Sequence, residues 1–338
     1  MTNVLFISSN HADYLADSLL HGLKSLPEVN AIDYPKVEIL YKTSQGKYPI
    51  RGGGFTLYTL LEDIPVDRTN IKQKLQAGAF DIVIFSSIHR QFSLFLELYP
   101  VLGRTKTIIA DGEDSPALFP YRGDYWRDTH FWFLPKVHKE FIYYKREWTP
   151  ATIRYRWYKL LPEFICRLLP APENLRTISF SIPKEKILKI LTTKTKLFPK
   201  HIVDPEVSRH IEGSQVKYPF DSEYDYYTDL QSSRFGITTK RSGWDCLRHY
   251  EIAANGTVPC FLNLDRKPAT CAPHGLDSSN SIAYSDYHDL FTKIKNLSPE
   301  AYTQLQNGAW EWAKRNTTIH RAYALLNQHD LMKTKEFA

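Results

Sequence analysis

The chain has 338 residues, which at ~150 residues per domain corresponds to about two domains and excludes a small disulfide-stapled scaffold. Apolar residues make up 43% and charged residues 24%, as in an average globular protein. No apolar run reaches the ~18 residues needed to cross a bilayer, which excludes a spanning helix. The net charge of +6 favours anionic ligands without specifying one.

The first residues and the cysteines indicate where the protein works. The opening segment, residues 1–14, contains no basic leader, and its short apolar run is typical of a buried strand. No CxxC pair is formed by the four cysteines, Cys166, Cys246, Cys260 and Cys271. We therefore predict reduced, structural cysteines, no bound metal and a cytoplasmic location.

Short apolar strands alternate with amphipathic helices in the first half of the chain. The predicted strands are residues 4–8, 81–86 and 107–110, and the predicted helices are 13–26, 70–77 and 92–102. This alternation is typical of a parallel sheet that is covered by helices on both faces. We therefore expect a doubly wound α/β domain.

Polar and titratable side chains follow the three predicted strands. His11 comes after the first strand, His89 after the second, and Asp111, Glu113 and Asp114 after the third. In open α/β sheets the ligand crevice lies beyond the carboxyl ends of the strands. These five residues are therefore the candidates for catalysis.

The second half of the chain repeats the pattern less regularly. Strands are predicted over residues 177–182, 187–191, 234–238, 258–263 and 281–284, and helices over 204–211, 299–315 and 317–328. A second α/β domain accounts for this succession. We place the first domain at residues 1–175 and the second at 176–315, with the C-terminal helix, within 316–338, packing back on the first.

Tryptophan and tyrosine are mixed with lysine and arginine between residues 121 and 167. Such a mixture suits a peripheral position at the inner face of a membrane, beside a lipid-linked substrate. It equally suits a packed helical layer with its cations at the surface. We favour the packed layer.

Residues 233–261 form the segment whose pattern is most informative about binding. A strand ends at residue 238, a loop carries Lys240 and Arg241, and a helix is predicted to open near Trp244 or Asp245, with Asp245 as its N-cap or in its first turn. The amide groups and the macrodipole of a helix N-terminus favour an anion such as a diphosphate. This segment is therefore the predicted anion site.

The same helix carries Arg248 and Glu251 three positions apart, followed by Gly256 as C-cap and by Pro259 in the next strand. The alternative is an ordinary amphipathic helix with a solvated ion pair. The succession resembles the nucleotide-sugar-binding element of GT-B glycosyltransferases, in their exostosin-like and group-1-like branches. That resemblance implies two Rossmann-like, doubly wound α/β domains that face a cleft.

The resemblance also implies roles for single residues in donor binding. Glu251 matches the acidic residue that binds the donor ribose, and Arg248 lies where the donor phosphates would bind. Lys240, Arg241 and the helix that opens near Trp244 would stabilise the leaving diphosphate. The first glutamate of the E-x7-E pattern of the retaining families is replaced by Gly243, which argues against a retaining mechanism.

The function implied is transfer of a sugar from a nucleotide-diphosphate donor to a hydroxyl acceptor in glycan or glycoconjugate synthesis. One of Asp111, Glu113 and Asp114, or His11 or His89, would act as general base. We expect neither cofactor nor metal, because basic side chains can neutralise the diphosphate. The competing idea is a DxD-type Mg²⁺ or Mn²⁺ site at Asp111 and Glu113.

Other functions fit parts of the pattern. A phage or viral enzyme that glycosylates DNA would also be basic, and a glycan- or nucleotide-binding protein without catalysis would need no base. An epimerase or dehydrogenase could use the same fold, but no G-x-G-x-x-G follows the first strand. The glycine run at residues 51–55 lacks the P-loop lysine and is interpreted as a hairpin or an acceptor-side loop.

Overall fold

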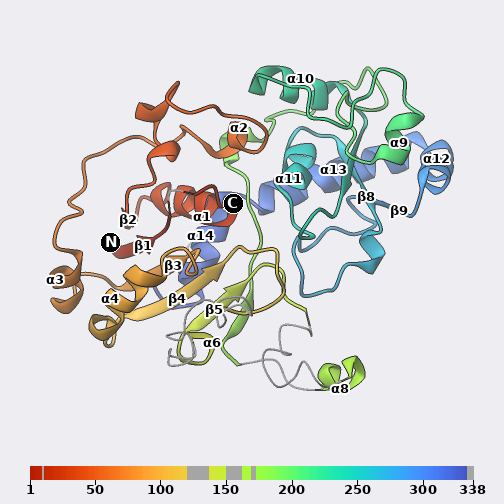
Figure 1. Ribbon diagram of the computed structural model, residues 1–338. Coiled ribbons are helices and arrows are strands. Elements are labelled where there is room, and N and C mark those ends of the chain that lie inside the picture. Colours follow the sequence, from red (N-terminus) through yellow and green to blue (C-terminus); the bar gives the residue numbers. More distant parts are fainter. Residues whose placement is uncertain (10, 120–136, 150–161, 169–172, 333–338) are drawn as a thin grey trace.

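The structure is a computed structural model that describes residues 1–9, 11–119, 137–149, 162–168 and 173–332. Its first lobe contains a six-stranded parallel sheet in the order β2-β1-β3-β4-β5-β6 (Figure 1). The strands are β1 (Thr2–Ile7), β2 (Val29–Tyr34), β3 (Ile82–Ser86), β4 (Lys106–Asp111), β5 (Ile142–Lys145) and β6 (Leu175–Thr177).

Helices cover this sheet on both faces. In β1, Val4 and Phe6 belong to one buried cluster, whereas Leu5 and Ile7 belong to another, because successive side chains of a strand point to opposite faces. This confirms the predicted doubly wound domain. Within the described residues before Thr177, the helices are α1 (Tyr14–Lys24), α2 (Gly54–Leu57), α3 (Ile71–Gln76), α4 (Phe92–Leu102), α6 (Val137–Glu140) and α8 (Glu163–Leu168), with short 3-10 helices η1 (Glu38–Leu40) and η2 (Lys42–Ser44).

The second lobe is built on a three-stranded parallel sheet, β7-β8-β9, among the described residues. Its strands and helices are β7 (Phe235–Thr239), β8 (Val258–Leu262), β9 (Ile282–Tyr284), α9 (Pro205–Arg209), α10 (Glu223–Ser232), α11 (Leu247–Ala254), α12 (Tyr287–Lys295) and α13 (Pro299–Arg315), with 3-10 helices η5 (Lys184–Lys186) and η6 (Leu264–Arg266). The three strands lie where the sequence predicted them.

Two expected strands are wrong. Residues 187–191 form no strand, and of residues 177–182 only Thr177 belongs to one, at the end of β6. The reason is that the chain crosses between the lobes here. The amide of Ile182 donates to Asn316 O (3.1 Å), and its carbonyl accepts from Thr318 N (2.9 Å), so its backbone pairs with the returning crossing instead of a sheet.

The C-terminal helix α14 (Thr318–Asn327) lies in the first lobe although it directly follows α13 of the second, and it packs against α1 (Figure 1). Gly22 of α1 makes this approach close: a Cβ at this position would lie 2.0 Å from Thr318 O. Thr2 Oγ1 donates to Leu331 O (2.7 Å), beyond the end of α14. Because the backbone of Ile182 pairs with Asn316 and Thr318, the crossing before η5 and the crossing before α14 run side by side.

Two further sequence expectations concern the environment of the chain. Among the described residues, no helix combines the length and apolar character needed to cross a membrane. Cys246, Cys260 and Cys271 are free thiols. Most of residues 121–167, on which the membrane-interface hypothesis depends, lie outside the described residues.

Candidate active site

The parallel sheet brings the predicted strand-end residues to one edge. Beyond β3 and β4, His89 Nε2 lies 3.1 Å from Glu113 Oε1, and Arg90 Nη2 lies 3.4 Å from the same oxygen. The hydrogen bond from His89 lowers the pKa of Glu113 and keeps it ionised. Oε2 of Glu113 makes no hydrogen bond to any residue of the described chain. His11, which follows β1, is exposed.

The two other carboxylates of this loop are tied to cations. Asp111, at the end of β4, is 2% exposed, and its Oδ1 lies 2.9 Å from the buried Lys145 Nζ. The hydroxyl of Tyr143 donates to Asp111 Oδ2 at 2.5 Å. Asp114 accepts a hydrogen bond from Arg146. Asp111 is thus buried in an ion pair and Asp114 pairs with a guanidinium, whereas Glu113 is the partly exposed carboxylate of the three that is hydrogen-bonded to a histidine.

A metal site at Asp111 and Glu113 was the competing expectation. The oxygen atoms of Asp111 are engaged by Lys145 and Tyr143, and one oxygen of Glu113 is engaged by His89. Within the described ranges, no group of three or more His, Cys, Asp or Glu side chains is arranged to hold a metal ion. A metal ion bound at Asp111 would compete with Lys145 and Tyr143 for the carboxylate oxygens.

Arg146 connects this edge to the second lobe. Its Nε donates to Gly112 O (3.0 Å), and its Nη1 donates to Glu147 Oε1 (2.8 Å) and to Asp245 O (3.1 Å). The guanidinium also lies 4.5 Å from the centroid of the Phe180 ring. A single buried side chain thus holds the loop after β4 close to the residues that precede α11. This role of Arg146 cannot be predicted from the sequence, since its partners lie up to 99 positions away.

The N-cap of α11 is Cys246, and the expectation that Asp245 caps the helix is wrong. Asp245 Oδ2 instead accepts from Phe180 N (2.8 Å), and Oδ1 accepts from Tyr250 OH (3.1 Å). Burial raises the pKa of Asp245 to about 6, against the opposing effect of Arg146. The carboxylate therefore anchors the start of the helix to the crossing between the lobes.

The N-terminus of α11 has the properties of an anion site. Cys246 provides no side-chain cap, so the first amides of the helix lack the partner that a capping residue would give. Nη1 of Arg248, in the first turn, is buried and has no hydrogen-bond partner within the described structure. Unpaired donors at a helix N-terminus favour a phosphate.

The other predicted donor residues lie just before this helix. Lys240 and Arg241 follow β7, and both are exposed. Lys240 Nζ lies 5.1 Å from the centroid of the Trp244 ring. Gly243 packs closely against the first lobe, since a Cβ there would lie 2.5 Å from Glu147 Oε1. The basic loop therefore lies beside the α11 N-terminus.

Glu251 is 3% exposed, and hydroxyl groups of the protein engage both of its oxygens. Thr56 Oγ1 donates to Oε1 (2.5 Å), and Tyr226 OH donates to Oε2 (2.7 Å). Burial raises the pKa of Glu251. Thr56 belongs to α2 in the first lobe, and its Oγ1 also lies 2.9 Å from Tyr227 OH. Thr56 could not be recognised from the sequence, because its partner Glu251 lies 195 positions away.

Comparison with protein-family models and with curated proteins finds no match. Among solved structures, a glycosyltransferase from Rickettsia africae ESF-5 aligns over 97% of this chain and 97% of its own length, with a TM-score of 0.56 and 10% identity. HepE from Anabaena, solved in complex with UDP-glucose, aligns over 98% of this chain and 100% of its own, with a TM-score of 0.51 and 9% identity. The chain therefore has the GT-B fold, with two Rossmann-like lobes.

Proposed function

We propose that the protein is a glycosyltransferase that moves a sugar from a nucleotide-diphosphate donor to a hydroxyl acceptor. The observation that carries the proposal is the uncapped N-terminus of α11 with the buried, unpaired Arg248 Nη1, held close to the loop that bears Glu113. Arg146, which bonds Gly112 O and Asp245 O, makes that connection. The solved complex of HepE with UDP-glucose supports a nucleotide-sugar donor.

The donor diphosphate would bind at the N-terminus of α11. Arg248 would pair with a phosphate oxygen, and Lys240 and Arg241 would approach from the loop after β7. As the bond between the sugar C1 and the diphosphate oxygen breaks, negative charge grows on the leaving group. Fixed helix amides and cations stabilise that charge in the transition state. This neutralisation needs no metal ion.

The acceptor hydroxyl would bind beside Glu113. Its oxygen forms the new bond to C1, and its proton passes to Oε2 of Glu113. His89 and Arg90 hold the other oxygen of Glu113 and fix the direction of the carboxylate. An acceptor that attacks from the face opposite the leaving diphosphate inverts the configuration at C1. Because donor and acceptor groups come from different lobes, correct placement of the lobes is part of catalysis.

Isothermal titration calorimetry with UDP, GDP, CDP, ADP and their sugar conjugates tests the proposal. We expect one nucleotide series to bind, with affinity unchanged by EDTA. Arg248→Ala should weaken that binding at least tenfold, since a charged hydrogen bond to phosphate contributes about 1.5–3 kcal/mol. Arg209→Ala, at an exposed arginine of α9, is the matched control and should bind like wild type. Failure of every nucleotide to bind the folded protein would contradict the proposal.

A further inference from the structure

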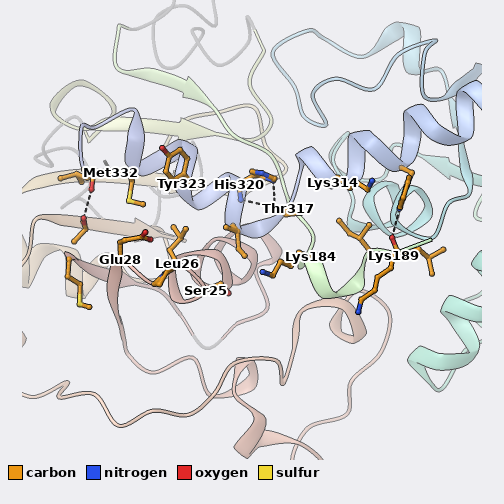
Figure 2. Close-up of a pocket in the computed structure, with 18 residues that line it drawn as sticks. Ser25, Leu26, Glu28, Lys184, Lys189, Lys314, Thr317, His320, Tyr323 and Met332 are labelled. Carbon is orange, nitrogen blue, oxygen red and sulfur yellow. Dashed lines mark hydrogen bonds between the residues drawn. The ribbon is translucent and has the colours of Figure 1, made fainter. Parts of the chain in front are cut away.

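A cavity of about 880 Å³ lies on the side of the first lobe away from the candidate active site. Its wall includes Thr2, where β1 begins, and Glu28, directly before β2 (Figure 2). The strands are parallel, so their amino ends lie at the edge opposite Glu113 and the α11 N-terminus. The volume is within the range of small-molecule sites, ~300–1,000 Å³. This cavity is therefore separate from the proposed donor and acceptor sites.

Much of the cavity wall is apolar. Leu26 comes from the loop between α1 and β2, Ile187 from the segment after η5, Trp310 from α13 and Ile319 from α14. Trp310 Nε1 donates to Leu188 O (2.9 Å), which fixes the indole against the crossing segment. Apart from Leu26, these side chains are half-buried. The cavity thus presents an apolar surface that an apolar ligand could cover.

The rim of the cavity is positively charged. Lys184 and Lys189 are exposed and form no ion pair with any residue in the described part of the chain. Lys314 also lines the cavity but is paired with Glu311 (2.7 Å). Glu28 is the carboxylate of the lining, and it is already engaged in another interaction. Two cations therefore remain to attract an anionic head group.

We propose that this cavity binds a single-chain amphiphile with an anionic head, such as a fatty-acid-type carboxylate. The chain would cover the apolar wall around Leu26, Ile187 and Ile319, and the head would lie between Lys184 and Lys189. Apolar walls with a few charged groups at fixed positions are the usual composition of such sites. The proposal does not depend on the function assigned to the other edge.

The cavity lies beside the two segments that cross between the lobes. Lys184, Ile187 and Thr317 all line it, and they lie on or next to the two crossings that Ile182 joins by hydrogen bonds to Asn316 and Thr318. An occupant would contact both crossings at once. It would therefore favour one relative placement of the lobes over others.

Calorimetry with dodecanoate below its critical micelle concentration tests the proposal. We expect saturable binding of one molecule to the wild-type chain, weakening as salt is added. Lys184→Glu combined with Lys189→Glu should reduce the affinity about tenfold or more. The matched control, Lys72→Glu with Lys200→Glu, changes the net charge equally at exposed lysines outside the cavity lining and should bind like wild type. Dodecyltrimethylammonium, with the same chain and the opposite charge, should bind much more weakly.

A second variant tests the apolar wall. Ile319→Trp places a larger ring in the cavity and should abolish dodecanoate binding, while circular dichroism confirms that the protein is folded. Absence of dodecanoate binding to the wild type would overturn the proposal, and so would equal affinity in the Lys184→Glu, Lys189→Glu variant. Sedimentation with anionic vesicles without binding of the monomeric amphiphile would assign this face to a membrane surface and would also overturn it.

Discussion

Glu251, which we propose binds the donor ribose, is also a contact between the lobes. Its carboxylate is satisfied by Thr56 from the first lobe and by Tyr226 from the second. A ribose hydroxyl can reach Glu251 only by displacing one of them. Thr56 is the partner that domain movement can withdraw, since it comes from the other lobe. We therefore propose that donor binding and the placement of α2 are coupled at this residue.

This coupling predicts different results for two substitutions. Glu251→Gln should weaken nucleotide-sugar binding about ten- to a hundredfold, because a hydrogen bond to a charged group contributes about 1.5–3 kcal/mol. Thr56→Val should leave the affinity equal or higher, because the competing hydroxyl is removed. Both are measured by calorimetry, with melting curves to confirm folding. Equal loss of affinity in the two variants would mean that Thr56 helps to hold the donor.

The lowered pKa of Glu113 predicts how the rate of the proposed reaction depends on pH. Glu113→Gln should lower kcat by about 10²–10⁴ with little change in KM, the range expected for loss of a general base. The acid limb of the wild-type kcat profile should lie below the ordinary range of a glutamate, because His89 lowers the pKa of Glu113. The limb should vanish in the variant. Glu97→Gln, at an exposed glutamate of α4, should behave as wild type.

The sequence indicated Glu113, His89 and Arg248 because strand ends and helix starts can be located from local patterns. Their positions were predicted, and their roles remain predictions. The sequence could not indicate Arg146 or Thr56, because their partners are distant in the chain. Nor could it show that Asp111 is neutralised by Lys145, since that pairing depends on the register between β4 and β5.

At the scale of elements, the contact between α1 and α14 depends on Gly22. Alanine normally favours a helix over glycine by about 1 kcal/mol. Here the added Cβ would lie 2.0 Å from the backbone oxygen of Thr318, so α14 would have to shift. We expect Gly22→Ala to lower the free energy of unfolding by about 1–3 kcal/mol, as measured by urea denaturation. Ser93→Ala, at an exposed position of α4, should change it by less than about 0.5 kcal/mol.

Elements with a strong local pattern were predicted, and those determined by contacts between lobes were not. The buried runs of β1, β3 and β8 were located from their apolar residues alone. The apolar residues near Ile187 resemble a strand equally well, but Ile187 is half-buried against the core and Ile190 is 80% exposed. The sequence could not show that no neighbouring strand pairs with them. A contact between lobes also determines where α11 begins. The carboxylate of Asp245 accepts a hydrogen bond from Phe180 N instead of capping the helix, and α11 begins two residues later.

At the scale of the whole molecule, the two lobes share buried surface. Leu19 of α1, Leu247 of α11 and Trp312 of α13 belong to one continuous cluster of buried side chains. Movement of the lobes must therefore take place around this cluster. The second lobe also has a core of its own, formed by β7, β8 and β9 with their flanking helices.

Three histidines in the second lobe are held neutral. Burial lowers the pKa of His249 to about 3, and those of His201 and His274 to about 4. His249 Nδ1 lies 2.8 Å from Thr238 Oγ1, and Nε2 lies 2.9 Å from Trp244 O. Each folded-state pKa is below the unfolded value of about 6.5, so the unfolded chain binds more protons as the pH falls. Their contribution to stability is complete above pH 6.5 and is lost toward pH 4.

Single variants separate this effect from the buried carboxyl groups, which act in the opposite direction. Burial raises the pKa of Asp245 to about 6, so its contribution to stability increases as the pH falls from 6 toward 4. At pH 5, which is 1.5 units below the unfolded pKa of about 6.5, each buried histidine should lower the free energy of unfolding by about 2 kcal/mol, at ~1.4 kcal/mol per pH unit. The loss of unfolding free energy between pH 7 and pH 5, measured in urea, should therefore be about 2 kcal/mol smaller in His249→Gln than in wild type.

His288→Gln, at an exposed histidine of α12, should keep the wild-type pH dependence. A wild-type pH dependence in His249→Gln as well would show that the buried imidazole does not drive acid unfolding.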